Sequence, residues 1–160
     1  MKLLKNKTVW LIGVFLLSGL TTYQLAAAPK VEDEVKFRQS GMMFMRWNMG
    51  KIKKYVIKRP ESFDQEKVLA AAKVIASIAN SDMNVLYKKE SLGVIGWKQS
   101  RLKTDYFEQS DKVEDLSNAF RTEANKLALV AEEGEPEEIK HQFNNVFQSC
   151  KSCHKAFRRK

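Results

Sequence analysis

The sequence is poor in the residues that build metal centres, with only two cysteines and two histidines among its 160 residues. A structural zinc site needs four ligands, and only His141 and a carboxylate could join the two cysteines and the second histidine. Zinc is therefore a weak interpretation. Alternating apolar and polar runs, internal repeats and low-complexity segments are also lacking, which disfavours both a β-sheet protein and a repeat array.

Both cysteines fall in one motif near the C-terminus, Cys150-Lys151-Ser152-Cys153-His154. C-x-x-C-H is the attachment signature of a c-type haem, because two thiols can add to its two vinyl groups and the adjacent imidazole can bind its iron. In a helix the two cysteines lie about 300° apart, at roughly 100° per residue, so both can reach neighbouring pyrrole edges. The motif predicts one covalent haem c with His154 as axial ligand. A thiol redox pair is the alternative.

The N-terminus has the features of a secretory signal peptide. Three lysines among the first seven residues precede an apolar stretch at 9–20, and small residues at 26–28 form a cleavage zone. We expect cleavage after Ala27, since a cut after Ala28 would place Pro29 first. Residues 1–27 are then the signal peptide and 28–160 the mature domain. A retained anchor is the alternative, and both imply export to the periplasm, where bacterial thioether haem is attached.

The charge balance disfavours nucleic acid as a partner. Removing residues 1–27 leaves 25 basic against 19 acidic residues, a net charge of +6. No basic stripe interleaved with aromatic residues is present, as nucleic-acid binding would require. The moderate excess of positive charge is compatible with an acidic redox partner, with an anionic lipid surface, or with lysines that are simply solvated.

Apolar residues recur at intervals of three and four along most of the mature chain, which predicts helices. Four helices are expected: from Val35 to just before Pro60, from Ser62 or Asp64 to about 80–87, from Thr104 or Asp105 to Gly134, and from Pro136 onward. Residues 88–103 form a long connection. The inner face of the last helix would carry Phe143, Val146, Phe147, Cys150, Cys153, His154 and Phe157. The expected fold is all-α, an antiparallel four-helix bundle with one covalent haem c near the C-terminus.

This arrangement resembles the cytochrome c′ family and its relative cytochrome c-556. Beyond the haem motif, Lys36-Phe37-Arg38-Gln39-Ser40 is similar to the family's K-[FY]-R-Q-S stretch, and residues 153–158 are close to its ending C-H-x-x-[FY]-R. The resemblance covers the whole mature chain. It fails at 102–107, where the family's third helix usually begins with proline, an acidic residue, an apolar residue and tryptophan.

The resemblance implies roles for four further residues. Arg38 and Gln39 would lie by the haem, with Arg38 near a propionate that a guanidinium can bind bidentately, and Arg158 would lie beside the proximal His154. The alternative is that all three are solvated. Met42 would occupy the distal position, opposite His154. An apolar residue there leaves the iron open to NO and CO in cytochrome c′, whereas a methionine binds it in cytochrome c-556.

The function implied by the resemblance is a periplasmic monohaem cytochrome that exchanges electrons with redox partner proteins and binds NO or CO at an open distal site. A low-spin carrier with Met42 as sixth ligand is one alternative, and an NO-buffering protein without electron transfer is another. An enzyme is not implied, because no distal histidine or acid suited to peroxide chemistry can be placed. Family members often form homodimers through their first two helices, so a homodimer is also expected.

Overall fold

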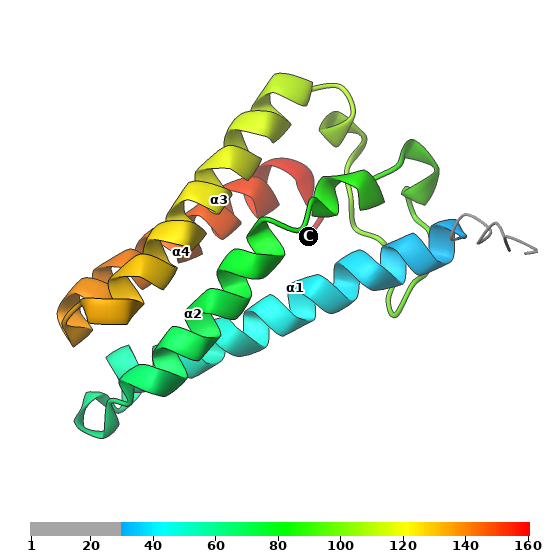
Figure 1. The fold of residues 1–160 in the computed structure, drawn as a ribbon. Helices are drawn as coiled ribbons and strands as arrows, with labels where there is room; N and C mark the ends of the chain where they lie inside the picture. The colour runs from blue at the N-terminus through cyan, green and yellow to red at the C-terminus, as the bar shows by residue number, and fades with distance from the viewer. Residues whose placement is uncertain (1–29) are drawn as a thin grey trace, which may run out of the picture.

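The computed structural model describes residues 30–160, which fold as a four-helix bundle (Figure 1). Helix α1 spans Val31–Lys53, α2 Gln65–Ala79, α3 Ser110–Glu133 and α4 Pro136–Phe157. Helices α1 and α2 form one antiparallel pair, α3 and α4 form a second, and α2 packs on α3. The predicted all-α bundle is confirmed. None of the helices in this part of the chain is long and apolar enough to cross a membrane. The predicted signal peptide and its cleavage site lie outside the described residues.

The first two helices begin and end for reasons visible in the sequence. Helix α1 begins at Val31, earlier than the predicted Val35, and its first turn holds three acidic residues that favour a helix N-terminus. It runs on into a π-helical turn, Lys54–Lys58, just before Pro60. Asp64 caps α2 by accepting a hydrogen bond from the Lys67 backbone N–H at 3.0 Å, as one of the two predicted caps.

The predicted start of the third helix is wrong. Thr104–Tyr106 form a short 3-10 turn, and α3 begins only at Ser110. Tertiary contacts override the local helix signal here, because the Tyr106 ring packs edge-on against Phe157 and the backbone of Leu102 pairs with that of Arg158. Two other predicted boundaries hold: α3 ends before Gly134, and Pro136 is the first residue of α4.

The main cluster of buried apolar side chains lies at one end of the bundle, although Val35, Leu102 and Phe157 are also buried nearer the motif. The main cluster comprises the second half of α1 with the turn that follows it, α2, the second half of α3 and the first half of α4. Its buried members are Ile52, Val56, Val68, Ala71, Ala72, Ile75, Ala124, Leu127, Ala131, Ile139, Phe143 and Val146. The cysteine motif and Met42 therefore lie in the opposite half of the bundle, beyond the last buried layer of this core.

Candidate functional site

Helix α4 carries the whole C-x-x-C-H motif in its last two turns. Pro136 at its first position and a reciprocal pair of hydrogen bonds between Glu135 and Glu138 fix its start, and the helix is continuous to Phe157. Cys150 and Cys153 thus lie in a helix, as their spacing in the haem motif requires. Cys150 and Cys153 are free thiols of intermediate exposure, and Cys150 packs against the core.

The surroundings of the two thiols disfavour a thiol oxidoreductase. Burial, followed by the neighbouring Cys153, raises the pKa of Cys150 to about 11, and burial also raises the pKa of Cys153. Reactive C-x-x-C pairs need the opposite shift, because the thiolate is the nucleophile. Both thiols are therefore protonated at neutral pH, and an apolar environment of this kind suits attachment to a large hydrophobic group.

Several apolar side chains of α1, α3 and α4 are left partly uncovered by the protein. Phe147 lies one helical turn before Cys150 and is 51% exposed, although it was predicted to face inward, and Met42 on α1 is 37% exposed. Leu116 and Phe120 on α3 are only half-buried. Two thiols, an imidazole and uncovered apolar side chains at the open end of the core together fit a haem c.

A group of aromatic rings that the sequence analysis missed lies beside the motif. Tyr87 and Tyr106 stack with their ring centroids 4.8 Å apart, and Tyr106 meets Phe157 edge-on at 5.4 Å. Burial raises the pKa of both tyrosines, that of Tyr87 to about 12, and the proximity of Cys153 contributes to both shifts. The only hint in the sequence was the departure from the family pattern at 102–107.

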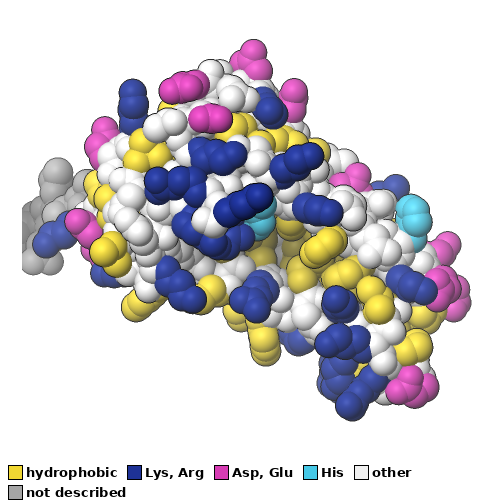
Figure 2. Space-filling view, turned by 180° about the vertical axis from the view of Figure 1, so that it is seen from behind, with side chains coloured by type: hydrophobic (Ala, Val, Ile, Leu, Met, Phe, Trp, Pro, Cys, Tyr) yellow, Lys and Arg dark blue, Asp and Glu magenta, His cyan; other side chains and the backbone are white. Residues whose placement is uncertain are grey.

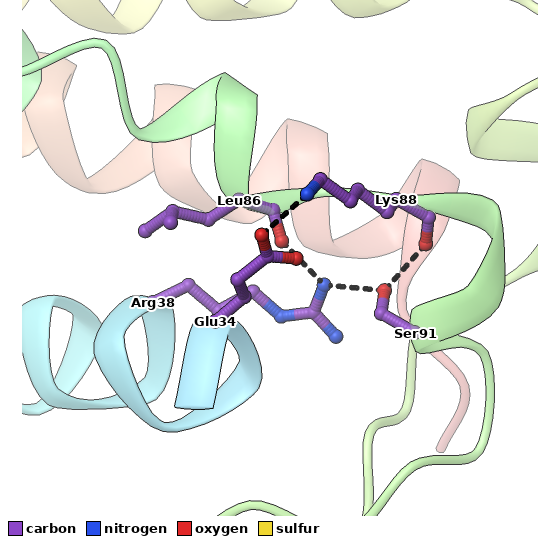
Figure 3. A network of polar contacts seen from close by, with 5 residues as sticks. All are labelled: Glu34, Arg38, Leu86, Lys88 and Ser91. Carbon is purple, nitrogen blue, oxygen red and sulfur yellow. Dashed lines mark hydrogen bonds and ion pairs between the residues drawn. The ribbon is translucent and has the colours of Figure 1, made fainter. Parts of the chain in front are cut away.

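Arg38 is buried and holds the connection between α2 and α3 in place. Only 5% of it is exposed. Its guanidinium donates to Ser91 Oγ at 2.8 Å and to the Leu86 carbonyl at 3.3 Å (Figure 3). The guanidinium donates a further hydrogen bond to Ser100 Oγ at 2.6 Å. It also lies over the Tyr87 ring, 4.8 Å from its centroid. Burial lowers its pKa. Arg38 is therefore not a solvated residue, while its predicted contact with a propionate stays a prediction.

Gln39 holds the same connection further along. Its Oε1 accepts from the backbone N–H groups of Trp97 and Lys98 at 2.8 and 3.1 Å, and its Nε2 donates to the Lys98 carbonyl at 2.7 Å. Gly96 lies so close to α1 that a Cβ there would stand 3.0 Å from the Lys36 backbone nitrogen. The Arg-Gln pair thus serves structure in the described residues, and its predicted role at the haem stays a prediction.

His154 lies on a strongly basic surface. It shares a shallow hollow of about 390 Å³ with Arg158 and other cations, and Figure 2 shows the basic side chains gathered around one histidine. Burial, and then the charge of Arg101, lowers the pKa of His154. Arg158 follows the last residue of α4, and its backbone N–H donates to the His154 carbonyl at 3.1 Å. The two residues thus line one hollow, while the predicted role of Arg158 beside a proximal ligand stays a prediction.

The comparisons with known proteins agree on one family. A family model described as cytochrome C′ matches residues 33–158. The chain is 39% identical to cytochrome c′ of Allochromatium vinosum over 89% of its length and 90% of that protein. It is 40% identical to cytochrome c′ of Rhodocyclus tenuis over 82% of its length and 97% of that protein.

Solved structures show the same fold. A cytochrome c′ with ligand-controlled dimer dissociation superposes with a TM-score of 0.78 at 40% identity, over 84% of this chain and all of that one. Cytochrome c′ from Thermochromatium tepidum superposes with a TM-score of 0.77 at 36% identity, again over 84% of this chain and all of that one. A nitric oxide complex of a variant of cytochrome c prime from Alcaligenes xylosoxidans, 24% identical, covers 82% of this chain and 98% of that one at 0.69.

Proposed function

Because this chain belongs to the cytochrome c′ family, a family of non-enzymatic proteins with one covalent haem c, we propose that it is an exported monohaem electron carrier with an open site for a small gas. The observation that carries the proposal is the motif in the last two turns of α4, at the end of the bundle away from the main buried cluster. When bound, the haem supplies one-electron chemistry at its iron. The protein supplies the attachment, the axial imidazole and the apolar surroundings.

In this proposal Cys150 and Cys153 hold the haem and His154 binds its iron. Their place on one continuous helix supports it, since α4 fixes the spacing of the three side chains. We expect the mature protein to exceed its polypeptide mass by one haem. Cys150→Ala or Cys153→Ala should weaken or halve attachment, and His154→Ala should change the visible spectrum. An unaltered spectrum in His154→Ala would refute the axial role.

Met42 decides whether the sixth iron position is open. The relatives that are about 40% identical are cytochromes c′, and this supports Met42 as a packing residue and not a ligand. Its side chain on α1 is 37% exposed, and a thioether also packs as an ordinary apolar side chain. We expect a high-spin spectrum that shifts readily with CO, and no change of spin state in Met42→Leu. A low-spin spectrum indifferent to CO that becomes high-spin in Met42→Leu would assign the sulfur to the iron.

Binding of NO is the second function that we propose. The support is a related cytochrome c prime solved with nitric oxide bound. Titration of the ferrous protein with NO, followed by absorption, should show stoichiometric binding. Fast electron exchange without any reaction with NO would exclude gas binding, whereas NO binding with sluggish electron exchange would favour an NO buffer.

A homodimer through α1 is proposed from its uncovered apolar face. Phe37, Phe44 and Trp47 recur along one side of the helix and are 56%, 48% and 58% exposed, and the rings of Phe44 and Trp47 stack. A related cytochrome c′ forms a dimer whose dissociation is controlled by ligand. Trp47→Ser should yield a monomer in sedimentation, whereas Leu129→Ser, at a position on α3 that is 68% exposed, should not. Equal sedimentation of the wild type and both variants would exclude this interface.

Export to the periplasm completes the proposal. The lysine-rich start, the apolar stretch at 9–20 and the small residues before Pro29 support it, together with the haem motif itself. The mass of the purified haem protein should correspond to residues 28–160 plus one haem. A full-length mass in a membrane fraction would favour the retained anchor.

A further inference from the structure

Six basic residues surround His154 without an acidic partner. With His154 they line the hollow of about 390 Å³ at the C-terminal end of α4, and we call them the basic rim: Arg101, Lys151, Lys155, Arg158, Arg159 and Lys160. None of them takes part in an ion pair within residues 30–160, where five ion pairs form elsewhere. The charges of the rim are therefore available to a partner on this face of the molecule (Figure 2).

The backbone holds the rim in a fixed shape. The Arg159 backbone N–H donates to the Arg101 carbonyl at 2.8 Å, and its guanidinium donates to the Ser100 carbonyl at 3.0 Å. Lys103 donates through its Nζ to the Ala156 carbonyl at 2.9 Å, which covers the open end of α4. The chain end and the connection thus form one scaffold, so little backbone order has to be gained when a partner binds.

We propose that the basic rim is the docking surface for an acidic electron-transfer protein, whose carboxylates pair with the rim while one electron passes between its centre and the haem. The inference deepens the proposed electron transfer and rests on it. Charge complementarity of this kind raises encounter rates by about 10–10³-fold and is weakened by salt. The rim surrounds the axial histidine, so a partner that pairs with it lies next to the group that exchanges the electron.

The composition of the rim favours a protein over a lipid surface. Proteins that lie on membranes combine basic residues with apolar side chains that enter the acyl boundary. The hollow beside His154 is lined by basic side chains alone, without any aliphatic side chain, phenylalanine, tyrosine or tryptophan.

The test compares two triple variants of the haem-loaded protein with equal changes in charge. The rim variant is Lys151→Glu, Lys155→Glu and Lys160→Glu. The control is Lys53→Glu, Lys58→Glu and Arg59→Glu, at exposed positions at the C-terminal end of α1 and just after it, and thus at the core end of the bundle. Stopped-flow oxidation of the ferrous proteins is measured with anionic hexacyanoferrate(III) and with cationic tris(phenanthroline)cobalt(III), each over a range of ionic strength.

For the wild type we expect the rate with the anionic oxidant to fall with salt and the rate with the cationic oxidant to rise. The oxidation rate of the rim variant with the anionic oxidant at low salt should be about tenfold or more below that of the wild type, while the rate of the control changes by less than about twofold. Binding of poly-L-glutamate, measured by calorimetry, should be strong in the wild type and the control and lost in the rim variant.

Each contrary outcome is distinct. Equal rates in the two variants, or equal binding of poly-L-glutamate, would overturn the docking surface and leave electron transfer standing. Failure of the wild type to exchange electrons with either oxidant would overturn the proposed function itself. Rim-dependent sedimentation with phosphatidylglycerol vesicles, without binding of poly-L-glutamate, would replace the acidic protein by a membrane surface.

Discussion

Replacing Arg38 by alanine should cost the protein about 3 kcal/mol of unfolding free energy. The guanidinium makes two short hydrogen bonds, to Ser91 Oγ and Ser100 Oγ, and hydrogen bonds of a charged group contribute about 1.5–3 kcal/mol each. Its position over the Tyr87 ring adds about 1 kcal/mol. The cost of burying the cation, which also lowers its pKa, offsets roughly half of this sum.

The assay is urea unfolding of the haem-loaded ferric protein, followed by circular dichroism. Arg46→Ala is the matched control, since Arg46 lies on the same helix and is exposed, and we expect it to change the free energy of unfolding by less than about 0.5 kcal/mol. Arg38→Lys keeps the charge but loses the planar guanidinium, so its free energy of unfolding should lie between those of Arg38→Ala and Arg46→Ala. A loss below about 1 kcal/mol in Arg38→Ala would refute the view that this guanidinium holds the connection.

Three further predictions concern a cap, a close contact and the thiols. Asp64→Ala removes the N-cap of α2 and should cost about 1 kcal/mol in the same urea assay, with an unchanged midpoint as the contrary result. Gly96→Ala places a Cβ against the α1 backbone and should cost about 1–3 kcal/mol; a stabilised protein would show that the connection can move aside. In the haem-free protein, the rate of alkylation of Cys150 should rise with pH, with a midpoint at about pH 11. The free energy of unfolding should fall as the pH rises from about 9 towards that midpoint, because the folded state holds the thiol proton more tightly than the unfolded state. Rapid alkylation at pH 8 would contradict the burial of this thiol.

The sequence was sufficient for the helices and the motif because both depend on short-range spacing. The intervals of apolar residues located all four helices, and Asp64 and Pro136 marked two of their starts. The start of α3 was missed because ring packing of Tyr106 on Phe157, which are 51 residues apart in the sequence, outweighs the local signal at Thr104.

The surroundings of the motif could not be predicted for the same physical reason. Arg38 and Gln39 were expected at the haem from a resemblance, yet their side chains bond to residues between 48 and 62 positions further along the chain. Nothing in the spacing of an irregular connection reveals where it will lie. Conversely, Phe147 was predicted to face inward, because a periodic stripe shows which face is apolar but not where the core ends.

The hydrogen bonds at the motif end of the bundle join residues that are far apart in the sequence, and this separation affects the order of folding. Gln39 and Lys98 are 59 residues apart, whereas α3 and α4 follow each other through the turn at Gly134 and Glu135. Closing a long loop costs more entropy than closing a short one, so the α3–α4 pair should form before the connection is fixed on α1. Until then, Cys150 and Cys153 stay within reach of the cofactor that is to be attached to them.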